Sequence, residues 1–313
     1  MLKNMKYVYT VYKEKSFSKA AKKLFISQPA LSAVVKKVES KIQLPIFDRS
    51  TNPIQLTPAG KYYIKSIEKI MEIEMDMKAY FSVIADERKG SINIGSAAFF
   101  CAHILPKLIQ EFKDKYPNYS VNSLEINADE LINCLKTGVI DLSLGVEMLD
   151  PNTFVNKIWK KEHIILAVPA SLEINKSLKS YRLTFDDIRS KEYLNSKYPA
   201  VNMKFFKNES FLLLRKGNDL YNRALSICKK AGFKPKINMY LDQMLTSYYV
   251  AYNGKGAVFV RDDITRYAEP TEKLFFYKID DENAERNIMI QYKKSSPLSK
   301  IAKDFIDILN QNK

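Results

Sequence analysis

The segment from Ser27 to Val38 combines the spacing of a helix with polar side chains of the types that bind nucleic acid. At 3.6 residues per turn, one side of this segment is apolar and carries Leu31, Val34, Val35 and Val38. The other side presents an amide, a hydroxyl and a cation, on a surface formed by Ser27, Gln28, Pro29, Ser32, Ala33 and Lys36. A side-chain amide can form two hydrogen bonds with adenine, and a lysine can bind a phosphate. We therefore expect Gln28 to read a base, Ser32 to reach a base or a phosphate, and Lys36 to bind a phosphate.

The distribution of charge supports this interpretation. The formal net charge of +15 comes from 50 basic and 35 acidic residues in a chain of 313. Residues 1–60 contain eleven basic residues against three acidic ones, so more than half of the excess lies in a fifth of the chain. Concentrated positive charge favours a polyanionic partner at the N-terminus. A solvated, lysine-rich surface would give the same charge, so the charge alone does not decide.

Two further helices are expected to position the Ser27–Val38 segment. Residues 5–12 have apolar side chains on one helical face, and Ser18 can cap a short second helix that ends near Leu24. Phe25 and Ile26 then form a turn, after which Ser27 can cap the third helix with a proline in its first turn. Three short helices with a tight second turn are typical of a helix-turn-helix.

A short hairpin is expected to follow these helices. Residues 45–49 and 54–56 have the composition of two short strands, and residues 50–53 are turn formers. Such a hairpin would make the segment a winged helix-turn-helix. Arg49 and Thr51 lie on it, and we expect both side chains to bind phosphates.

A long helix is expected after Thr57 and Pro58, which form a cap followed by proline in the first turn. Beyond Gly60, no glycine or proline occurs until residue 90. Side chains repeat at alternating spacings of four and three, at Tyr63, Ile67, Ile70, Glu74, Met77, Phe81 and Ile84. This seam resembles that of a coiled coil and predicts a dimer contact. The alternative is that the helix packs on its own domain.

The rest of the chain alternates between strands and helices, which predicts an α/β fold with a parallel sheet. Expected strands are residues 91–95, 119–126, 140–145, 164–168, 211–214, 237–241, 257–260 and 287–290. Expected helices lie between most of them, and a last helix runs through Ile301, Phe305 and Leu309.

Along nearly its whole length the sequence resembles LysR-type transcriptional regulators. The resemblance rests on the order and spacing of SFSKAAKKL at 16–24, SQPALS at 27–32, VE at 38–39, PIFDR at 45–49 and LTPAG at 56–60. The C-terminal part adds Gly95 before Leu105–Pro106, Gly138 with Asp141, Ala231–Gly232–Phe233 before Pro235, and Gly254–Lys255–Gly256.

The resemblance implies three parts: a winged helix-turn-helix DNA-binding domain at 1–60, a long linker and dimerisation helix at 61–88, and an effector-binding domain at 91–313. The effector-binding domain would be two-lobed and similar to periplasmic binding proteins, with lobe I at 91–160 and 266–313 and lobe II at 161–265. Implied partners are double-stranded DNA with an interrupted inverted repeat, a small-molecule effector between the lobes, and further copies of the chain in a homodimer or homotetramer. RNA polymerase is a further candidate partner.

Three positions depart from the family pattern. Lys15 and Gln43 stand where relatives usually carry glycine, so we expect a left-handed backbone at both, at a cost of roughly 1 kcal/mol each. Ala33 replaces a longer polar side chain that is common on the recognition helix, which removes one contact to DNA.

The effector site is expected between the lobes, at Ser96, Ala97, Ala98, Phe99, Val146, Asp242 and Gln243. A helix start near Phe99 would favour an anion. The family often adds hydroxyls there, but this chain has Ala97 and Phe99, so only Ser96 and the main chain remain to donate. An unpaired Asp242 would also oppose an anion.

We therefore expect an apolar or aromatic effector. Two alternatives remain: Phe99 and Phe100 fill the cleft of a regulator without a ligand, or they are ordinary core residues. They cannot both face the cleft from adjacent positions of one helix.

We do not expect an enzyme, a cofactor or a metal. His103 and His163 have no cysteine or carboxylate nearby at metal-ligand spacing, and no nucleotide-binding or nucleophile-elbow motif occurs. Cys101 beside two phenylalanines is better explained as a core residue. A solute-binding protein of the same effector-domain fold is the second functional class, but we find neither an export signal nor a membrane span. Three separate cysteines form no disulfide framework, so we expect a cytoplasmic protein.

Overall fold

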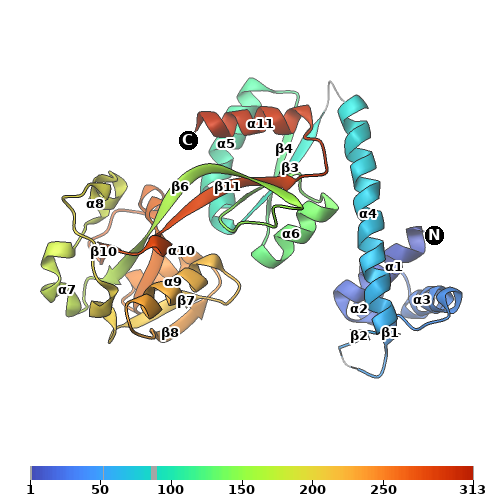
Figure 1. Ribbon diagram of the computed structural model, residues 1–313, viewed down its shortest axis with the longest axis horizontal. Helices are drawn as coiled ribbons and strands as arrows, with labels where there is room; N and C mark the ends of the chain where they lie inside the picture. Colours follow the sequence, from blue (N-terminus) through green and yellow to red (C-terminus); the bar gives the residue numbers. More distant parts are fainter. Residues whose placement is uncertain (1, 52, 86–89, 313) are drawn as a thin grey trace. The chain divides into compact units, whose positions relative to one another are not determined.

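A computed structural model describes residues 2–51, 53–85 and 90–312, in two compact units at 1–79 and 80–313 that are treated separately below (Figure 1). The first unit contains α1 (Leu2–Glu14), α2 (Phe17–Lys23), α3 (Gln28–Ile42) and most of α4 (Pro58–Ala85). Strands β1 (Phe47–Asp48) and β2 (Gln55–Leu56) pair antiparallel as the wing. Their common core includes Val8, Val11, Ala20, Leu31, Val35 and Ile46, all fully buried. The predicted winged helix-turn-helix is confirmed.

The helix caps agree with the sequence in two of three places. The Ser27 hydroxyl accepts the N–H of Ala30 and caps α3, and the Thr57 hydroxyl accepts the N–H of Gly60 at the start of α4. The prediction for α2 is wrong, because its cap is Ser16, whose hydroxyl accepts the N–H of Lys19. Ser16 precedes Phe17, and capping there lets the Phe17 side chain reach the core.

Lys15 and Gln43 have the expected left-handed backbone, with φ of 47° and 57°. Phe25, in the turn before α3, also has a positive φ of 54°, which the sequence did not indicate. These residues close helices where glycine would cause less strain. Gly60 has a different role, because a Cβ at this position would lie 2.0 Å from the main-chain oxygen of Ile46. A glycine therefore lets α4 pack closely against the wing.

The predicted seam of α4 is divided between two environments. Its first half, Tyr63, Ile67 and Ile70, packs on the core of the first unit, so the alternative reading holds there. Farther along, Met77 is 53% exposed, and Ile73 beside the seam is 67% exposed. The side chains of Phe81 and Ile84 lie outside the described residues.

In the described part of the second unit, a nine-stranded sheet has the order β4-β3-β5-β11-β6-β9-β7-β8, and β10 also pairs with β6. One end, lobe I, contains β3 (Ser91–Ser96), α5 (Leu105–Lys115), β4 (Ser120–Glu125), α6 (Ala128–Thr137), β5 (Leu142–Gly145) and α11 (Lys300–Gln311). Helices α5 and α11 lie side by side on one face of these strands, and α6 packs in a separate cluster (Figure 1).

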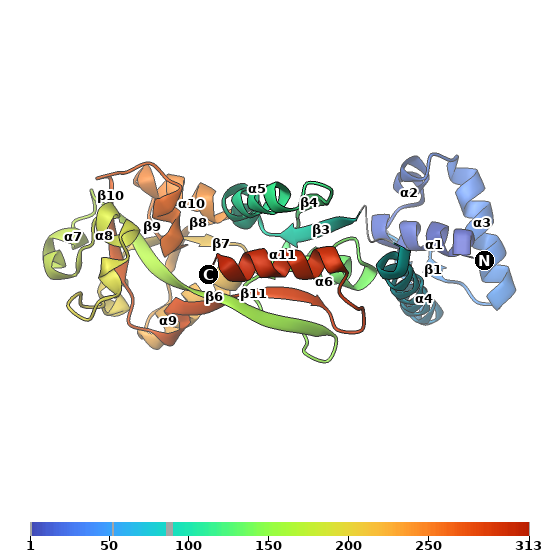
Figure 2. The same ribbon diagram turned by 90° about the horizontal axis from the view of Figure 1, so that it is seen from above.

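Lobe II is the other end of the sheet. It contains α7 (Ile174–Ser177), α8 (Phe185–Arg189), β7 (Ser210–Leu214), α9 (Asp219–Lys230), β8 (Lys236–Leu241), α10 (Met244–Tyr252), β9 (Ala257–Arg261) and β10 (Leu274–Lys278). The long strands β6 (Phe154–Pro169) and β11 (Glu285–Lys293) run from one lobe into the other as an antiparallel pair (Figure 2). The two lobes are therefore joined by continuous strands.

The predicted parallel sheet is correct for three strands of each lobe and wrong for the pairs that involve β6, β10 and β11. Strands β3, β4 and β5 are parallel in lobe I, as are β7, β8 and β9 in lobe II. Strands β6, β10 and β11 pair antiparallel with their neighbours, because β6 and β11 cross the junction in opposite directions.

One predicted lobe boundary needs correction. Residues 266–313 were expected in lobe I, but β10 pairs with the lobe II half of β6, at residues 165–169. Its side chains Leu274, Phe276 and Tyr277 are buried in the core of lobe II. The chain returns to lobe I only with β11. By pairing with β6, strand β10 buries its apolar side chains in the core of lobe II. An unpaired connecting segment on the surface would leave them exposed to water.

Among the described residues, we find no helix with the combination of length and apolarity that crossing a bilayer requires.

Candidate DNA-binding face and interlobe cavity

Helix α3 presents its polar side to solvent. Gln28, Pro29, Ala33 and Lys36 are exposed and Ser32 is half-buried, whereas Leu31, Val35 and Val38 are buried. Val34, expected on the apolar side, is only half-buried. The residues that can bind DNA therefore lie on one accessible face.

Arg49 connects the wing to this helix. Its guanidinium lies 3.0 Å from a carboxylate oxygen of Glu39, donates to the Ser32 hydroxyl at 3.4 Å, and lies over the ring of Phe17. The other oxygen of Glu39 accepts the N–H groups of Ile46 and Phe47. The structure thus brings together Ser32 and Arg49, which the sequence had treated as separate contacts.

Thr51 closes the turn of the wing. Its hydroxyl donates to the main-chain oxygen of Asp48 and accepts the N–H of Gln55, both at 3.2 Å. The Asp48 carboxylate accepts the hydroxyl and the N–H of Ser50, and these bonds lower the pKa of Asp48. Among the described residues of the wing, side chains at 48 and 51 therefore hold the main chain at 48, 50 and 55.

A cavity of about 410 Å³ lies between the two lobes. Five of the seven predicted effector residues line it: Ala97, Ala98, Val146, Asp242 and Gln243. Its lobe I side is mainly apolar and adds Phe100, Ile126, Leu131, Ile132, Leu144 and Leu149. Its lobe II side is polar and adds the loop from Arg215 to Asp219.

Ser96 does not lie on the wall of this cavity. Its side chain is fully buried, and its hydroxyl donates to the main-chain oxygen of Leu144 at 2.6 Å. Two main-chain donors near the expected helix start are also engaged, because the N–H groups of Phe100 and Cys101 both point to the oxygen of Ala97. A small carboxylate has fewer donors here than the sequence suggested.

Phe99, also predicted at the effector site, does not line the cavity. The ring lies 5.0 Å from His103 and 5.6 Å from Tyr267, with the guanidinium of Arg261 4.1 Å from its centroid. Phe100 lines the cavity and is 4% exposed. The two adjacent rings face different sides, as the geometry of a helix requires.

The segment Phe100–Ile104 is a π-helical turn, which the sequence analysis missed. The N–H of Leu105 donates to the oxygen of Phe100. Pro106 follows directly and lacks the N–H that an uninterrupted α-helix would use, and this residue is the only signal in the sequence. Turns of this type are rare and are frequently found at functional sites.

Charged groups on the lobe II side are mostly paired. Asp242 lies 3.2 Å from the guanidinium of Arg215, so the unpaired carboxylate that would oppose an anion is absent. Asp219 is bound by two guanidiniums, those of Arg223 at 2.8 Å and Arg286 at 2.5 Å.

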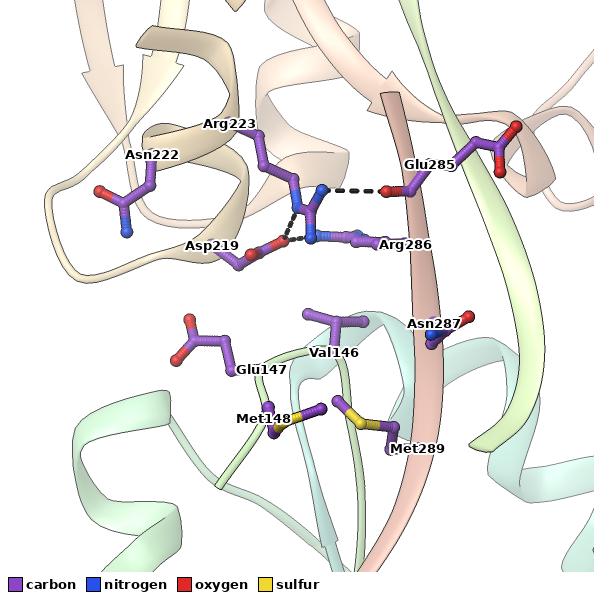
Figure 3. A pocket seen from close by; sticks show the side chains of 10 residues that line it. All are labelled: Val146, Glu147, Met148, Asp219, Asn222, Arg223, Glu285, Arg286, Asn287 and Met289. Atoms are coloured by element: carbon purple, nitrogen blue, oxygen red, sulfur yellow. Dashed lines mark hydrogen bonds and ion pairs between the residues drawn. The ribbon is translucent and has the colours of Figure 1, made fainter. Parts of the chain in front are cut away.

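A second cavity of about 420 Å³ adjoins the first and shares Val146, Glu147 and Asp219 with it. Figure 3 shows the carboxylate of Asp219 joined to the guanidiniums of both Arg223 and Arg286, with the side chains of Met148 and Met289 across the cavity. This cavity could not be predicted from the sequence, because its residues come from three distant segments.

Comparison with protein-family models gives two matches. Residues 2–61 match the bacterial regulatory helix-turn-helix protein, lysR family, and residues 85–313 match the LysR substrate binding domain. The chain belongs to the LysR family of transcriptional regulators. It combines a helix-turn-helix DNA-binding domain with an effector-binding domain.

Relatives and solved structures of the LysR family extend this result. The chain is 25% identical over 312 residues to the uncharacterised regulator YcgK of Bacillus subtilis, covering 99% of this chain and 94% of YcgK. It is 28% identical over 174 residues to the regulator BenM of Acinetobacter baylyi, covering 56% and 57%. The structure of full-length CbnR complexed with its target DNA matches with a TM-score of 0.61 at 18% identity, covering 100% of both chains. At that identity, the structural match shows the fold.

Burial favours the neutral forms of the thiol and the imidazole that lie in the π-helical turn of this LysR-family regulator. Burial raises the pKa of the Cys101 thiol, and the negative charge of Glu125 raises it further. Burial lowers the pKa of His103, and so does the nearby charge of Arg261. Within the described ranges, no group of three or more His, Cys, Asp or Glu residues has the geometry of a metal site.

Proposed function

We propose that this regulator reads its operator with the polar side of α3 and the wing. The observation that carries the proposal is the exposed face of Gln28, Ala33 and Lys36 in a segment with a net charge of +8. Gln28 forms two hydrogen bonds with a base, and the methyl group of Ala33 contacts a thymine methyl. Lys36 binds a phosphate, as does Thr51 through its hydroxyl. Ser27 and Pro29 position the start of the helix against the DNA backbone.

Arg49 has a composite role in this proposal. Its ion pair with Glu39 and its hydrogen bond to Ser32 orient the guanidinium at the junction of helix and wing. A phosphate at this junction would bind the guanidinium while the ion pair persists, because an arginine has five donors.

Selection from a random pool of DNA duplexes by the purified full-length chain tests the proposal. We expect enrichment of one interrupted inverted repeat, as the two-fold symmetry of a homodimer requires. Absence of any enriched sequence, with binding that depends only on salt concentration, would overturn it.

We further propose that a small molecule with an apolar body occupies the interlobe cavity and sets the activity of the regulator. The volume of about 410 Å³ is within the range of ligand sites, and Phe100 lies on the wall without filling the space. This observation favours an effector over regulation without a ligand. The apolar wall on lobe I contacts the body, and the polar loop Arg215–Asp219 of lobe II contacts its polar groups.

A thermal-shift screen distinguishes effector classes. Aromatic and neutral metabolites are compared with short aliphatic carboxylates, since a ligand at 100 times its Kd stabilises the folded state by roughly 2.7 kcal/mol. We expect stabilisation by members of the first group. Stabilisation by a short carboxylate alone would contradict the apolar effector.

We propose that the chain forms a homodimer through the exposed side of α4, and a homotetramer through further contacts. Tyr62, Ile73 and Met77 are 77%, 67% and 53% exposed, and their spacing puts them on one side of the helix. Such a patch is suited to a second copy of the same helix.

We place the regulator in the cytoplasm, where operator DNA is accessible. RNA polymerase is the partner through which a DNA-bound regulator of this kind would change transcription. Protein–protein crosslinking on a promoter fragment tests this contact.

A further inference from the structure

Five charged side chains form a continuous network at the junction of the lobes. Glu162 on β6 is fully buried and pairs with Arg261 on β9 and with Arg286 on β11, the latter at 2.5 Å. Arg286 continues to Asp219 at the start of α9, which also binds Arg223. Buried charges are stable only when they are paired, so these residues constrain one another.

The charged network, defined as Arg223, Asp219, Arg286, Glu162 and Arg261, contains three guanidiniums and two carboxylates. Arg261 is at the end of it, and its buried Nε–H has no hydrogen-bond partner among the described residues. One donor of the network is therefore left without an acceptor, at the end where Arg261 lies.

Two aromatic rings of lobe I face the guanidinium of Arg261. The centroids of the Phe99 and Phe100 rings lie 4.1 Å and 4.5 Å from the guanidinium carbon of Arg261. A guanidinium over the face of a ring is attracted by the ring quadrupole. Phe99 also packs against the cores of both lobes. Arg261 thus forms a contact between lobe II and the π-helical turn of lobe I.

The charged network lies next to both cavities. Phe100 lines the interlobe cavity, and Asp219 lines that cavity and its neighbour, which Arg223 and Arg286 also line (Figure 3). A molecule in the interlobe cavity can touch Phe100 and Asp219 directly. Its binding would then act on the network directly at Asp219, and at Arg261 through the ring of Phe100.

We propose that Arg261 is a positioning residue that fixes the orientation of the two lobes, and with it the shape of the interlobe cavity, through its contact with Phe99 and Phe100. The π-helical turn is the movable part. A π-helical turn contains one more residue than an α-helical turn, so a return to α-helical hydrogen bonds would rotate both rings. The inference rests on the proposed function, in which the interlobe cavity binds the effector.

The orientation of the lobes is measurable without an effector. Spin labels are introduced at the exposed positions Lys113 in lobe I and Lys229 in lobe II, after the partly exposed Cys101 and Cys134 have been replaced by serine. Labelled full-length chain is diluted with unlabelled protein, and the distance distribution is recorded by electron spin resonance. A second pair within lobe II, at Lys207 and Lys229, is the internal reference.

Two variants test the contact from its two sides. Phe99→Leu keeps an apolar side chain and removes the ring, and Arg261→Met keeps an unbranched side chain and removes the charge. We expect both to broaden or shift the distances between lobes, to leave the distances within lobe II unchanged, and to speed amide hydrogen exchange of residues 100–105 several-fold. If Arg261→Met does not fold, Phe99→Leu decides.

Matched controls separate this role from general destabilisation. Arg266→Met changes an arginine of the short helical segment that follows β9, whose side chain is 51% exposed, and Phe205→Leu changes a phenylalanine of lobe II that is 51% exposed. Neither control should change the distances between lobes. An unchanged interlobe distribution in Phe99→Leu, or an equal change in Phe205→Leu, would overturn the proposal. Because no effector is used, a failed ligand screen and a failed lobe measurement remain distinct results.

Discussion

The hydroxyl of Ser96 donates a hydrogen bond of 2.6 Å to the main-chain oxygen of Leu144, and so joins the ends of β3 and β5 below the interlobe cavity. This bond turns a predicted ligand contact into a structural one. It also means that the hydroxyl is compensated before any effector arrives, so a ligand would gain little by competing for it.

Ser96→Ala should therefore affect stability and leave effector selectivity unchanged. Loss of the donor leaves a buried carbonyl with fewer partners, so we expect the free energy of unfolding to fall by about 1–3 kcal/mol. Ser123→Ala, at an exposed position on the neighbouring strand β4, is the control and should have little effect. Chemical denaturation measures both. Loss of binding of an identified effector in Ser96→Ala, at unchanged stability, would restore the ligand role.

Gln28→Ala should relax the sequence specificity of DNA binding. The loss of two hydrogen bonds to one base should cost about 1–3 kcal/mol at the selected operator and much less on unrelated DNA. Fluorescence anisotropy with both duplexes gives the two affinities. Gln110→Ala, in an exposed part of α5, controls for loss of an amide elsewhere. An equal decrease on both duplexes would show that Gln28 binds the backbone.

Lys36→Ala should weaken binding to all sequences alike. Because one phosphate contact is lost, the slope of log affinity against log salt concentration should decrease by about 1. Lys41, also exposed on α3, points about 140° away around the helix by the 100° step per residue. Lys41→Ala should retain the full slope. Titrations at several salt concentrations test the pair, and the same loss in both variants would argue against a specific contact at Lys36.

Gln43→Gly should stabilise the first unit, because Gln43 has a φ of 57° that glycine adopts with less strain. We expect a gain of up to about 1 kcal/mol, partly offset by the greater freedom of glycine in the unfolded chain. Lys41→Gly, inside α3, should instead destabilise by about 1 kcal/mol. Opposite signs in thermal unfolding would confirm the assignment, and the same sign would contradict it.

Ile73→Asp should lower self-association and leave the first unit folded. Ile73 is 67% exposed on α4, so a carboxylate there disturbs only a partner that covers it. Ile67→Asp should unfold the first unit, because Ile67 is 2% exposed in its core. Sedimentation at micromolar concentration and thermal unfolding distinguish the two effects. Unchanged association of Ile73→Asp would show that another surface forms the dimer. Ile70 is unsuitable for this test, since it packs on the same core as Ile67.

Local signals explain what the sequence could predict. Ser27 with a proline two residues later marks the start of α3. The end of α3 was predicted at Gln43 because relatives usually have glycine at this position. The misplaced cap of α2 shows the limit of such signals, because Ser16 and Ser18 have the same chemistry and only the burial of Phe17 selects between them.

Contacts between distant segments could not be predicted in the same way. Arg261 and Glu162 are 99 residues apart, and the pairing of β10 with β6 depends on how lobe II closes. Nothing in the sequence around Ser96 indicates whether its hydroxyl donates to a ligand or to the main-chain oxygen of Leu144. The cleft residues Ala97, Val146 and Asp242 were found because each closely follows a predicted strand, and the family resemblance placed the ends of these strands at the cleft.

The central position of β11 affects the order in which the parts of the chain can fold during synthesis. Strand β11 lies between β5 and β6, so lobe I has no complete sheet until the ribosome has reached Lys293. The first unit and the core of lobe II, at 164–284, are synthesised before that point. Because domains of a nascent chain fold largely in order of emergence, lobe I closes last. A chain interrupted before β11 would therefore have its DNA-binding domain and no interlobe cavity, and would occupy operators without responding to an effector.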